Sequence, residues 1–185
     1  KDFSKAIALW LNILDIDPEN VDVQKKIEFL YEMKQKKDLE LEKAKYNYKL
    51  ARRELALNLK ENIPDEEALK NLLKTKEYAE NAFASFITAY RIDSLDSELQ
   101  LLREDMQRLE KFITSEEKRL KTNIELREKI SAFVNLARTA MKEERYKDAL
   151  SNWEEVLKLL PEHAEAIEGK RQAMIAIENV IRYEN

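Results

Sequence analysis

The residues that could carry out chemistry are few in this sequence. His163 is the only histidine, in the turn Leu160-Pro161-Glu162-His163-Ala164, and there is no cysteine. A metal site built on His163 has no second histidine or cysteine to share the ion, and nucleophilic Ser/His or Cys/His pairs fail for the same reason. A single glycine, Gly169, excludes a glycine-rich phosphate loop. We therefore expect no enzyme, no metal and no cofactor, and we interpret His163 as a solvated turn residue.

Other reactive side chains have simpler interpretations. Carboxylates are numerous and could act in acid-base pairs, but they are scattered among lysines, which is typical of a solvated helical surface. Several aromatic residues recur at helical spacing, which favours core packing over an aromatic binding box: Trp10, Tyr46, Tyr48, Phe86 and Trp153. A short lysine run, Lys34, Lys36 and Lys37, is interpreted as a solvated face.

The composition predicts long helices. Among 185 residues there are one glycine and three prolines, whereas sheets need turn residues at frequent intervals. Helix-forming residues dominate, so we expect an all-α fold. The net charge of −4 argues against nucleic-acid binding, and no apolar run approaches the roughly 20 residues of a membrane span. We expect a soluble chain, cytoplasmic or periplasmic, that is a piece of a longer protein because it opens at Lys1 inside an amphipathic pattern.

The elements follow from apolar periodicity and from the prolines. Pro18, Pro64 and Pro161 mark helix breaks, and Ser94 is the predicted N-cap of another helix. Capping-box patterns at 114–117 and 122–125 are possible bends in that helix. The expected helices are 2–17, 21–62, a short pair at 65–77 and 78–91, one from 95 that extends to about 143, then 145–159 and 164–182.

One pattern occurs three times along the chain. An aromatic or aliphatic residue, a central alanine and further aromatic and aliphatic residues recur around Ala6, Ala82 and Ala149. These segments resemble the second helix of a tetratricopeptide repeat, in which the small residue permits close approach of two helices. Around 130–163 the resemblance covers a whole repeat, with four residues at the packing positions of its first helix: Phe133, Leu136, Ala137 and Ala140.

The resemblance implies a site. In this family the first helix of a repeat lines a groove that accepts a peptide or partner helix. On this chain the predicted partner-binding residues are Ser131, Val134, Asn135, Arg138 and Lys142. Arg138 and Lys142 are one turn apart, so they could pair with an acidic segment. The alternative is that these residues are ordinary surface and that partners contact the long helices.

Two heptad seams separate the repeat-like segments. One contains Ile27, Leu30, Leu41, Ala44, Tyr48, Ala51 and Leu55, and the other contains Leu95, Leu99, Leu102, Met106, Leu109 and Ile113. We predict that these two long helices pack antiparallel, with the short helix pair at their tip; a solenoid of long helices is the competing arrangement.

The predicted organisation has five segments. They are a first repeat-like element (1–31), a long stalk helix (32–62), a repeat-like hairpin (63–94), a second stalk helix (95–123), and a C-terminal repeat with a capping helix (124–185). The sequence therefore predicts a protein-interaction scaffold within a larger assembly, with a protein or peptide partner. The alternative function is a coiled-coil spacer or a homo-oligomer formed through the long helices.

Overall fold

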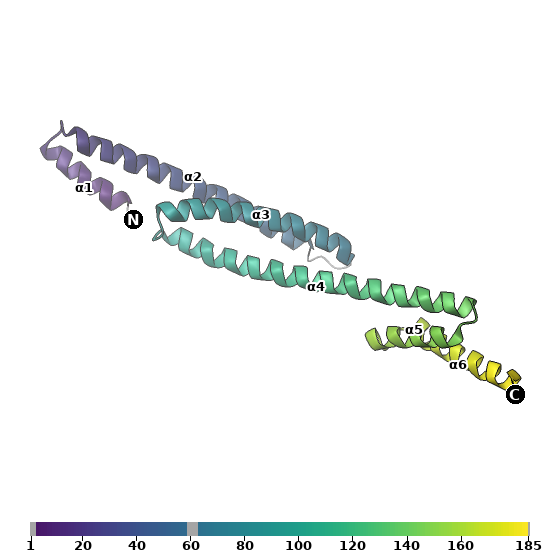
Figure 1. Cartoon of the computed structure of the whole chain (residues 1–185). Helices are drawn as coiled ribbons and strands as arrows, with labels where there is room; N and C mark the ends of the chain where they lie inside the picture. Colours follow the sequence, from purple (N-terminus) through teal and green to yellow (C-terminus); the bar gives the residue numbers. More distant parts are fainter. Residues whose placement is uncertain (1–2, 59–62, 185) are drawn as a thin grey trace. The chain divides into compact units, whose positions relative to one another are not determined.

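The computed structural model describes residues 3–58 and 63–184, and in this part of the chain the regular structure consists of six α-helices without a strand (Figure 1). The prediction of an all-α fold is confirmed. The helices are α1 (Phe3–Ile16), α2 (Val21–Asn58), α3 (Asp65–Ile92), α4 (Ser97–Lys142), α5 (Tyr146–Leu159) and α6 (Ala164–Glu184).

The chain divides into two compact units, residues 1–120 and residues 121–185. The first contains α1, α2, α3 and the first part of α4, and the second contains the rest of α4, α5 and α6. Helix α4 is continuous over 46 residues, so neither capping-box pattern breaks it. The last predicted segment, 124–185, falls within the second unit.

Helix α3 is one helix of 28 residues, and the prediction of a short helix pair over 65–91 is wrong. Its buried residues are spaced by three, four or seven residues, so one heptad pattern continues across the supposed break: Ala68, Leu72, Thr75, Ala82, Phe86 and Ala89. Residues 76–79 contain neither glycine nor proline. Nothing at this point therefore opposes continuation of the helix.

The core of the first unit joins α2, α3 and α4. Leu41 and Ala44 of α2 share one buried cluster with the start of α4, at Leu99, Leu102 and Met106. Ala51, further along α2, shares a second cluster with later residues of α4, Leu109, Ile113 and Leu120. Because residue numbers rise together on both helices, α2 and α4 run in the same direction.

Helix α3 runs antiparallel to both (Figure 1). Its C-terminal residues Ala82, Phe86 and Ala89 lie in the first cluster, and its N-terminal residues Ala68 and Leu72 lie in the second. Long antiparallel helices are thus present, but α2 packs antiparallel to α3 and not to α4 as predicted. The prediction that the two seams pair antiparallel at a hairpin tip is wrong because the connection between them is itself a long helix.

The turn before α4 differs from the predicted cap at Ser94. The helix begins at Ser97, and the Asp96 carboxylate accepts hydrogen bonds from the backbone N–H groups of Glu98 (2.9 Å) and Leu99 (3.2 Å). Asp96 is therefore the N-cap. Leu95, predicted to begin the seam, is 78% exposed because it precedes the helix.

In the second unit, α5 packs on α6 and on the end of α4. The buried cluster contains Val134, Ala137, Ala140, Ala149, Trp153, Val156, Ala166 and Ala173. Gly169 of α6 lies directly under the Trp153 indole, since a Cβ atom built on Gly169 would meet ring atoms at 2.4 to 2.7 Å. Ala149 and Ala82 are fully buried and Ala6 is half-buried, as expected for residues that permit close helix packing.

Candidate partner-binding surfaces

The predicted groove residues lie on α4 in the second unit, and the structure separates them into three kinds. Ser131, Asn135 and Lys142 are exposed, as a binding surface requires. Val134 is only 7% exposed and belongs to the buried cluster, so its assignment to the groove is wrong. Val134 lies three residues before Ala137, and residues at that spacing share one face of a helix.

Leu136 shows the reverse error. The resemblance placed it on the packing face, yet 55% of it is exposed. The buried face of α4 here is centred on Ala137, and the next residue in either direction is rotated by about 100° away from that centre. Leu136 therefore adds an apolar side chain to the surface of the second unit.

Arg138 is exposed but engaged within the chain. Its Nε and Nη2 groups donate hydrogen bonds to the two carboxylate oxygens of Glu165 on α6, at 2.6 and 2.7 Å. This bidentate hydrogen bonding lowers the pKa of the Glu165 carboxyl and raises that of the Arg138 guanidinium. The predicted pairing of Arg138 with a partner's carboxylate would have to displace Glu165.

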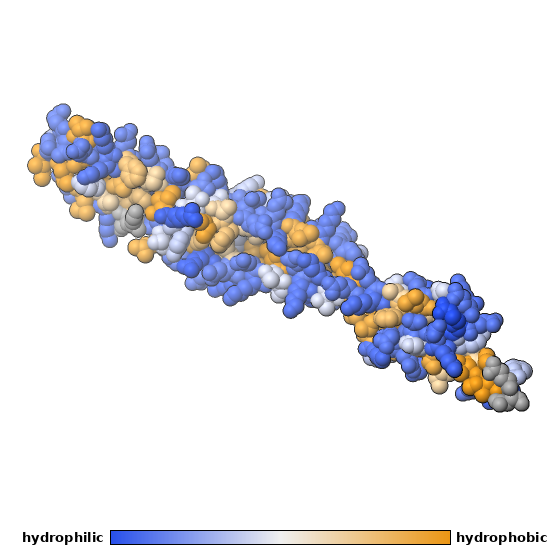
Figure 2. Space-filling model, in the orientation of Figure 1, coloured by the Kyte–Doolittle hydropathy of each residue, from blue (hydrophilic) through white to orange (hydrophobic). Residues whose placement is uncertain are grey.

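Apolar side chains on α6 form an exposed stripe. Ile167, Met174 and Ile181 are 52%, 47% and 53% exposed, and they are spaced by seven residues. Seven residues are nearly two full turns, so these side chains follow one line along the helix. Figure 2 shows apolar surface towards the C-terminal end of α6. We call these three residues the α6 stripe.

A second apolar surface lies on α1 in the first unit. Leu9, Ile13 and Ile16 are 66%, 39% and 87% exposed, at spacings of four and three that place them on one face. The opposite face of α1 carries the buried Phe3 and Ile7. Both surfaces exceed the scattered single apolar residues expected on any soluble protein.

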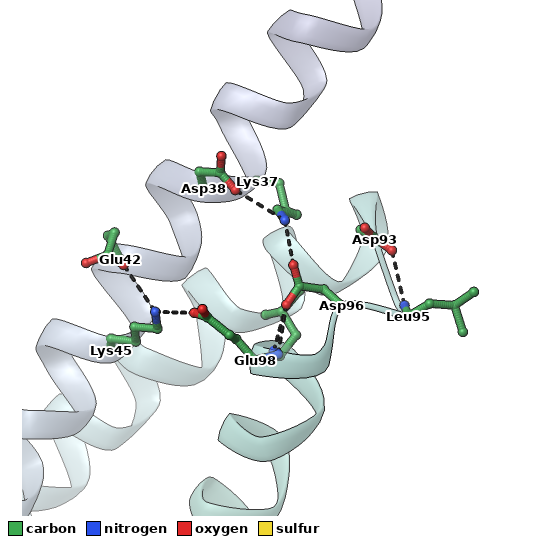
Figure 3. Close-up of polar contacts among 9 residues, drawn as sticks. Lys37, Asp38, Glu42, Lys45, Asp93, Leu95, Asp96 and Glu98 are labelled. Carbon is green, nitrogen blue, oxygen red and sulfur yellow. Dashed lines mark hydrogen bonds and ion pairs between the residues drawn. The ribbon is translucent and has the colours of Figure 1, made fainter. Parts of the chain in front are cut away.

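Lys37, on the seam of α2, is a buried charged residue of the first unit and is 7% exposed (Figure 3). Its ammonium donates to Asp96 Oδ2 at 2.5 Å and lies 3.2 Å from Asp38. Burial disfavours the charge, yet these hydrogen bonds outweigh that effect and raise the pKa of Lys37. Lys45 forms a second bridge from α2 to Glu98. Lys37 was interpreted as part of a solvated face, and this interpretation is wrong.

The Asp96 carboxylate therefore makes two structural interactions. One carboxylate oxygen caps α4 and the other accepts a hydrogen bond from the Lys37 ammonium. Burial alone would raise the pKa of Asp96, but the hydrogen bonds from Lys37 and from the N–H groups of Leu99 and Glu98 lower it. A lysine and an aspartate that satisfy each other in this way hold α2 against the α3–α4 turn. They present no free group for chemistry.

His163 also has a structural partner. Its Nδ1 accepts a hydrogen bond from the backbone N–H of Ala166 at 3.2 Å, so it caps the start of α6 and is half-buried. Within residues 3–58 and 63–184, no group of three or more His, Asp or Glu side chains is arranged to hold a metal ion. None of the described helices combines the length and apolar character needed to cross a membrane.

Comparison with known proteins finds no match to this chain among family models, curated proteins or solved structures. The resemblance to tetratricopeptide repeats therefore depends on the three aligned sequence segments and stays a prediction. The function has to be argued from the surfaces themselves.

Proposed function

We propose that this chain is a protein-interaction scaffold and that an α-helix of a partner protein packs on the α6 stripe. The observation that supports the proposal most is the stripe itself, three large apolar residues about half-exposed on one line of a helix. Seven-residue spacing is the pattern with which one helix packs along another. A partner helix would bury these side chains, each contributing on the order of 1–2 kcal/mol.

The polar residues Ser131, Asn135 and Lys142 of α4 extend the proposal within the same unit. They are exposed and lie on one face of the helix, where they could contact polar groups of a bound segment. Arg138 is a weaker candidate because Glu165 already occupies its guanidinium.

The alternative, oligomerisation along the second heptad seam, finds less support. Leu99 is fully buried and Leu102 is 7% exposed, both inside the chain's own three-helix core. A seam that is filled within one chain is not open to a second copy. Light scattering remains informative, and the scaffold proposal expects a monomer at micromolar concentration.

The proposal is tested by affinity capture with the intact protein, followed by mass spectrometry. Met174→Asp places a charge in the centre of the stripe and should remove the captured partner. Gln172→Asp is the matched control, because residue 172 is exposed on a different face of α6 and should leave capture unchanged. Equal capture by both variants would refute binding at the stripe.

A separate variant addresses the α4 residues. Lys142→Glu changes an exposed residue and should reduce capture if the predicted groove is used. Arg138→Glu is unsuitable for this purpose, because it would also place two carboxylates together at Glu165.

A further inference from the structure

A groove between α3 and α4 lies in the first unit, and none of its lining residues belongs to the surfaces described above. Its walls come from one face of α3, with Lys76, Ala79, Glu80, Phe83 and Ala84, and from Glu110, Ile113 and Thr114 of α4. It encloses ≈ 400 Å³, which is within the range of about 300–1,000 Å³ found for ligand sites and is enough for a large apolar side chain.

The floor of the groove is apolar and held in place. Phe83 is 48% exposed, and its ring stacks on the buried Phe86 with 6.1 Å between ring centroids. Ile113 is 3% exposed and closes the floor from the α4 side. An exposed aromatic ring that is already fixed by a buried neighbour loses little conformational freedom when it binds.

The rim of the groove is acidic. The Lys76 ammonium forms an ion pair with the Glu117 carboxylate of α4, 3.2 Å away. Lys76 therefore does not neutralise Glu80, which lies one turn later on α3. Among the described residues, Glu80 and Glu110 make no hydrogen bond or ion pair. One carboxylate therefore stands on each helix, on either side of an apolar floor, in a chain whose net charge is already −4.

This arrangement is complementary to one class of partner. A helix that presents a large apolar side chain between basic side chains would fill the floor and place a cation near each carboxylate. An acidic or neutral helix would gain only the apolar contact and would be repelled at the rim. A second copy of this chain is disfavoured because it carries the same negative charge.

We propose that the groove between α3 and α4 binds a basic amphipathic helix of a partner protein, with Phe83 as the apolar contact and Glu80 and Glu110 as the charged contacts. The site is independent of the α6 stripe, so either proposal can fail without the other.

The test uses the intact protein and a fluorescein-labelled amphipathic peptide built from lysine, leucine and alanine, with binding followed by fluorescence anisotropy. The double variant Glu80→Gln with Glu110→Gln should weaken binding about tenfold at low salt, a loss that shrinks as salt screens the rim. Phe83→Ala should weaken binding at low and at high salt, because it removes an apolar contact.

Two matched controls separate the groove from general attraction between a basic peptide and an acidic protein. Glu77→Gln with Glu162→Gln changes the net charge by the same amount at exposed residues outside the groove, and Phe112→Ala removes an aromatic residue, 39% exposed, that does not line it. Both should leave binding unchanged. The proposal is overturned if the controls weaken binding as much as the groove variants, if the groove variants have no effect, or if a peptide with glutamate in place of lysine binds equally well.

Discussion

At the scale of single residues, the contact between Trp153 and Gly169 determines how closely α5 and α6 approach. The indole is 3% exposed and lies where a side chain of residue 169 would begin. Its Nε1 group is buried without a hydrogen-bond partner among the described residues, so packing rather than polar contact holds the ring. The sequence contains a signal for this contact, because Gly169 lies inside a predicted helix. Glycine is unfavourable in a helix interior unless a neighbouring side chain leaves no room for a Cβ atom.

Gly169→Ala should destabilise the second unit. The new methyl group would force the rigid indole to move, which costs about 1–3 kcal/mol, against a gain of up to about 1 kcal/mol in helix propensity. Urea denaturation of the wild type and the variant measures the net loss. In a Trp153→Leu background the same substitution should be neutral or stabilising, and an equal loss in both backgrounds would contradict the packing explanation.

Glu144 is a second residue with a specific backbone role. It has a positive φ of 59° at the end of α4. There the N–H of Arg145 donates a hydrogen bond to the carbonyl of Ala140, and the N–H of Glu144 donates one to the carbonyl of Met141. This is the Schellman motif, in which glycine is preferred at the left-handed position. Glu144→Gly should therefore stabilise the second unit by roughly 0.5–1 kcal/mol, measurable as a higher Tm. Glu144→Ala, which keeps the strain, should not.

At the scale of helices, the regular elements could be predicted and their partners could not. Pro18, Pro64 and Pro161 lie between helices, and the apolar periodicity predicted the start of α2 and both ends of α4 to within a few residues. The predicted end of α2 at residue 62 lies outside the described residues. Whether α2 and α4 run parallel or antiparallel depends on whether α3 is one helix or two. The repeat pattern predicted two short helices, but the heptad pattern continues and α3 is one helix.

The bridge between Lys37 and Asp96 belongs to this scale because it joins α2 to the start of α4. The pKa of Asp96 is lowered from an ordinary value of 3.8, so its contribution to stability is present above that pH and is lost as the pH falls through the folded-state pKa. The pKa of Lys37 is raised from 10.5, so its contribution is present below that pH and is lost as the pH rises through the folded-state pKa.

Asp96→Asn is the variant that tests the bridge. Asparagine can still cap α4, so the variant loses mainly the charge that faces Lys37. It should be less stable than the wild type by about 1–3 kcal/mol at neutral pH and should show a weaker loss of stability below about pH 4. Denaturation at a series of pH values measures both effects. If the variant and the wild type lose the same stability below about pH 4, Asp96 does not contribute in this way.

At the scale of the whole molecule, the candidate site could be predicted only in part. The sequence placed Ser131, Asn135 and Lys142 on an exposed face of α4, but it could not show that Glu165 holds Arg138 or that Val134 faces α5 and α6. Exposure of a side chain depends on which helices cover it, and a repeat pattern read from one helix does not contain that information. The groove between α3 and α4 was missed for the same reason.

The division into two units has a measurable consequence. The units have separate buried clusters, one in the second unit around Trp153 and Val156 and two in the first unit among α2, α3 and α4. Gly169→Ala should therefore reduce amide hydrogen-exchange protection in α5 and α6 and leave α2 and α3 unchanged. Equal loss of protection throughout the chain would show that the two units unfold together.

We propose that the α6 stripe is where another protein binds. Site-specific photocrosslinking measures this most directly, with the crosslinking residue at position 174 and a control at position 172 of the same helix. If a partner binds at the α6 stripe, position 174 should yield a crosslinked partner protein and position 172 much less. Equal yields at both positions, or crosslinks only within this chain, would contradict it.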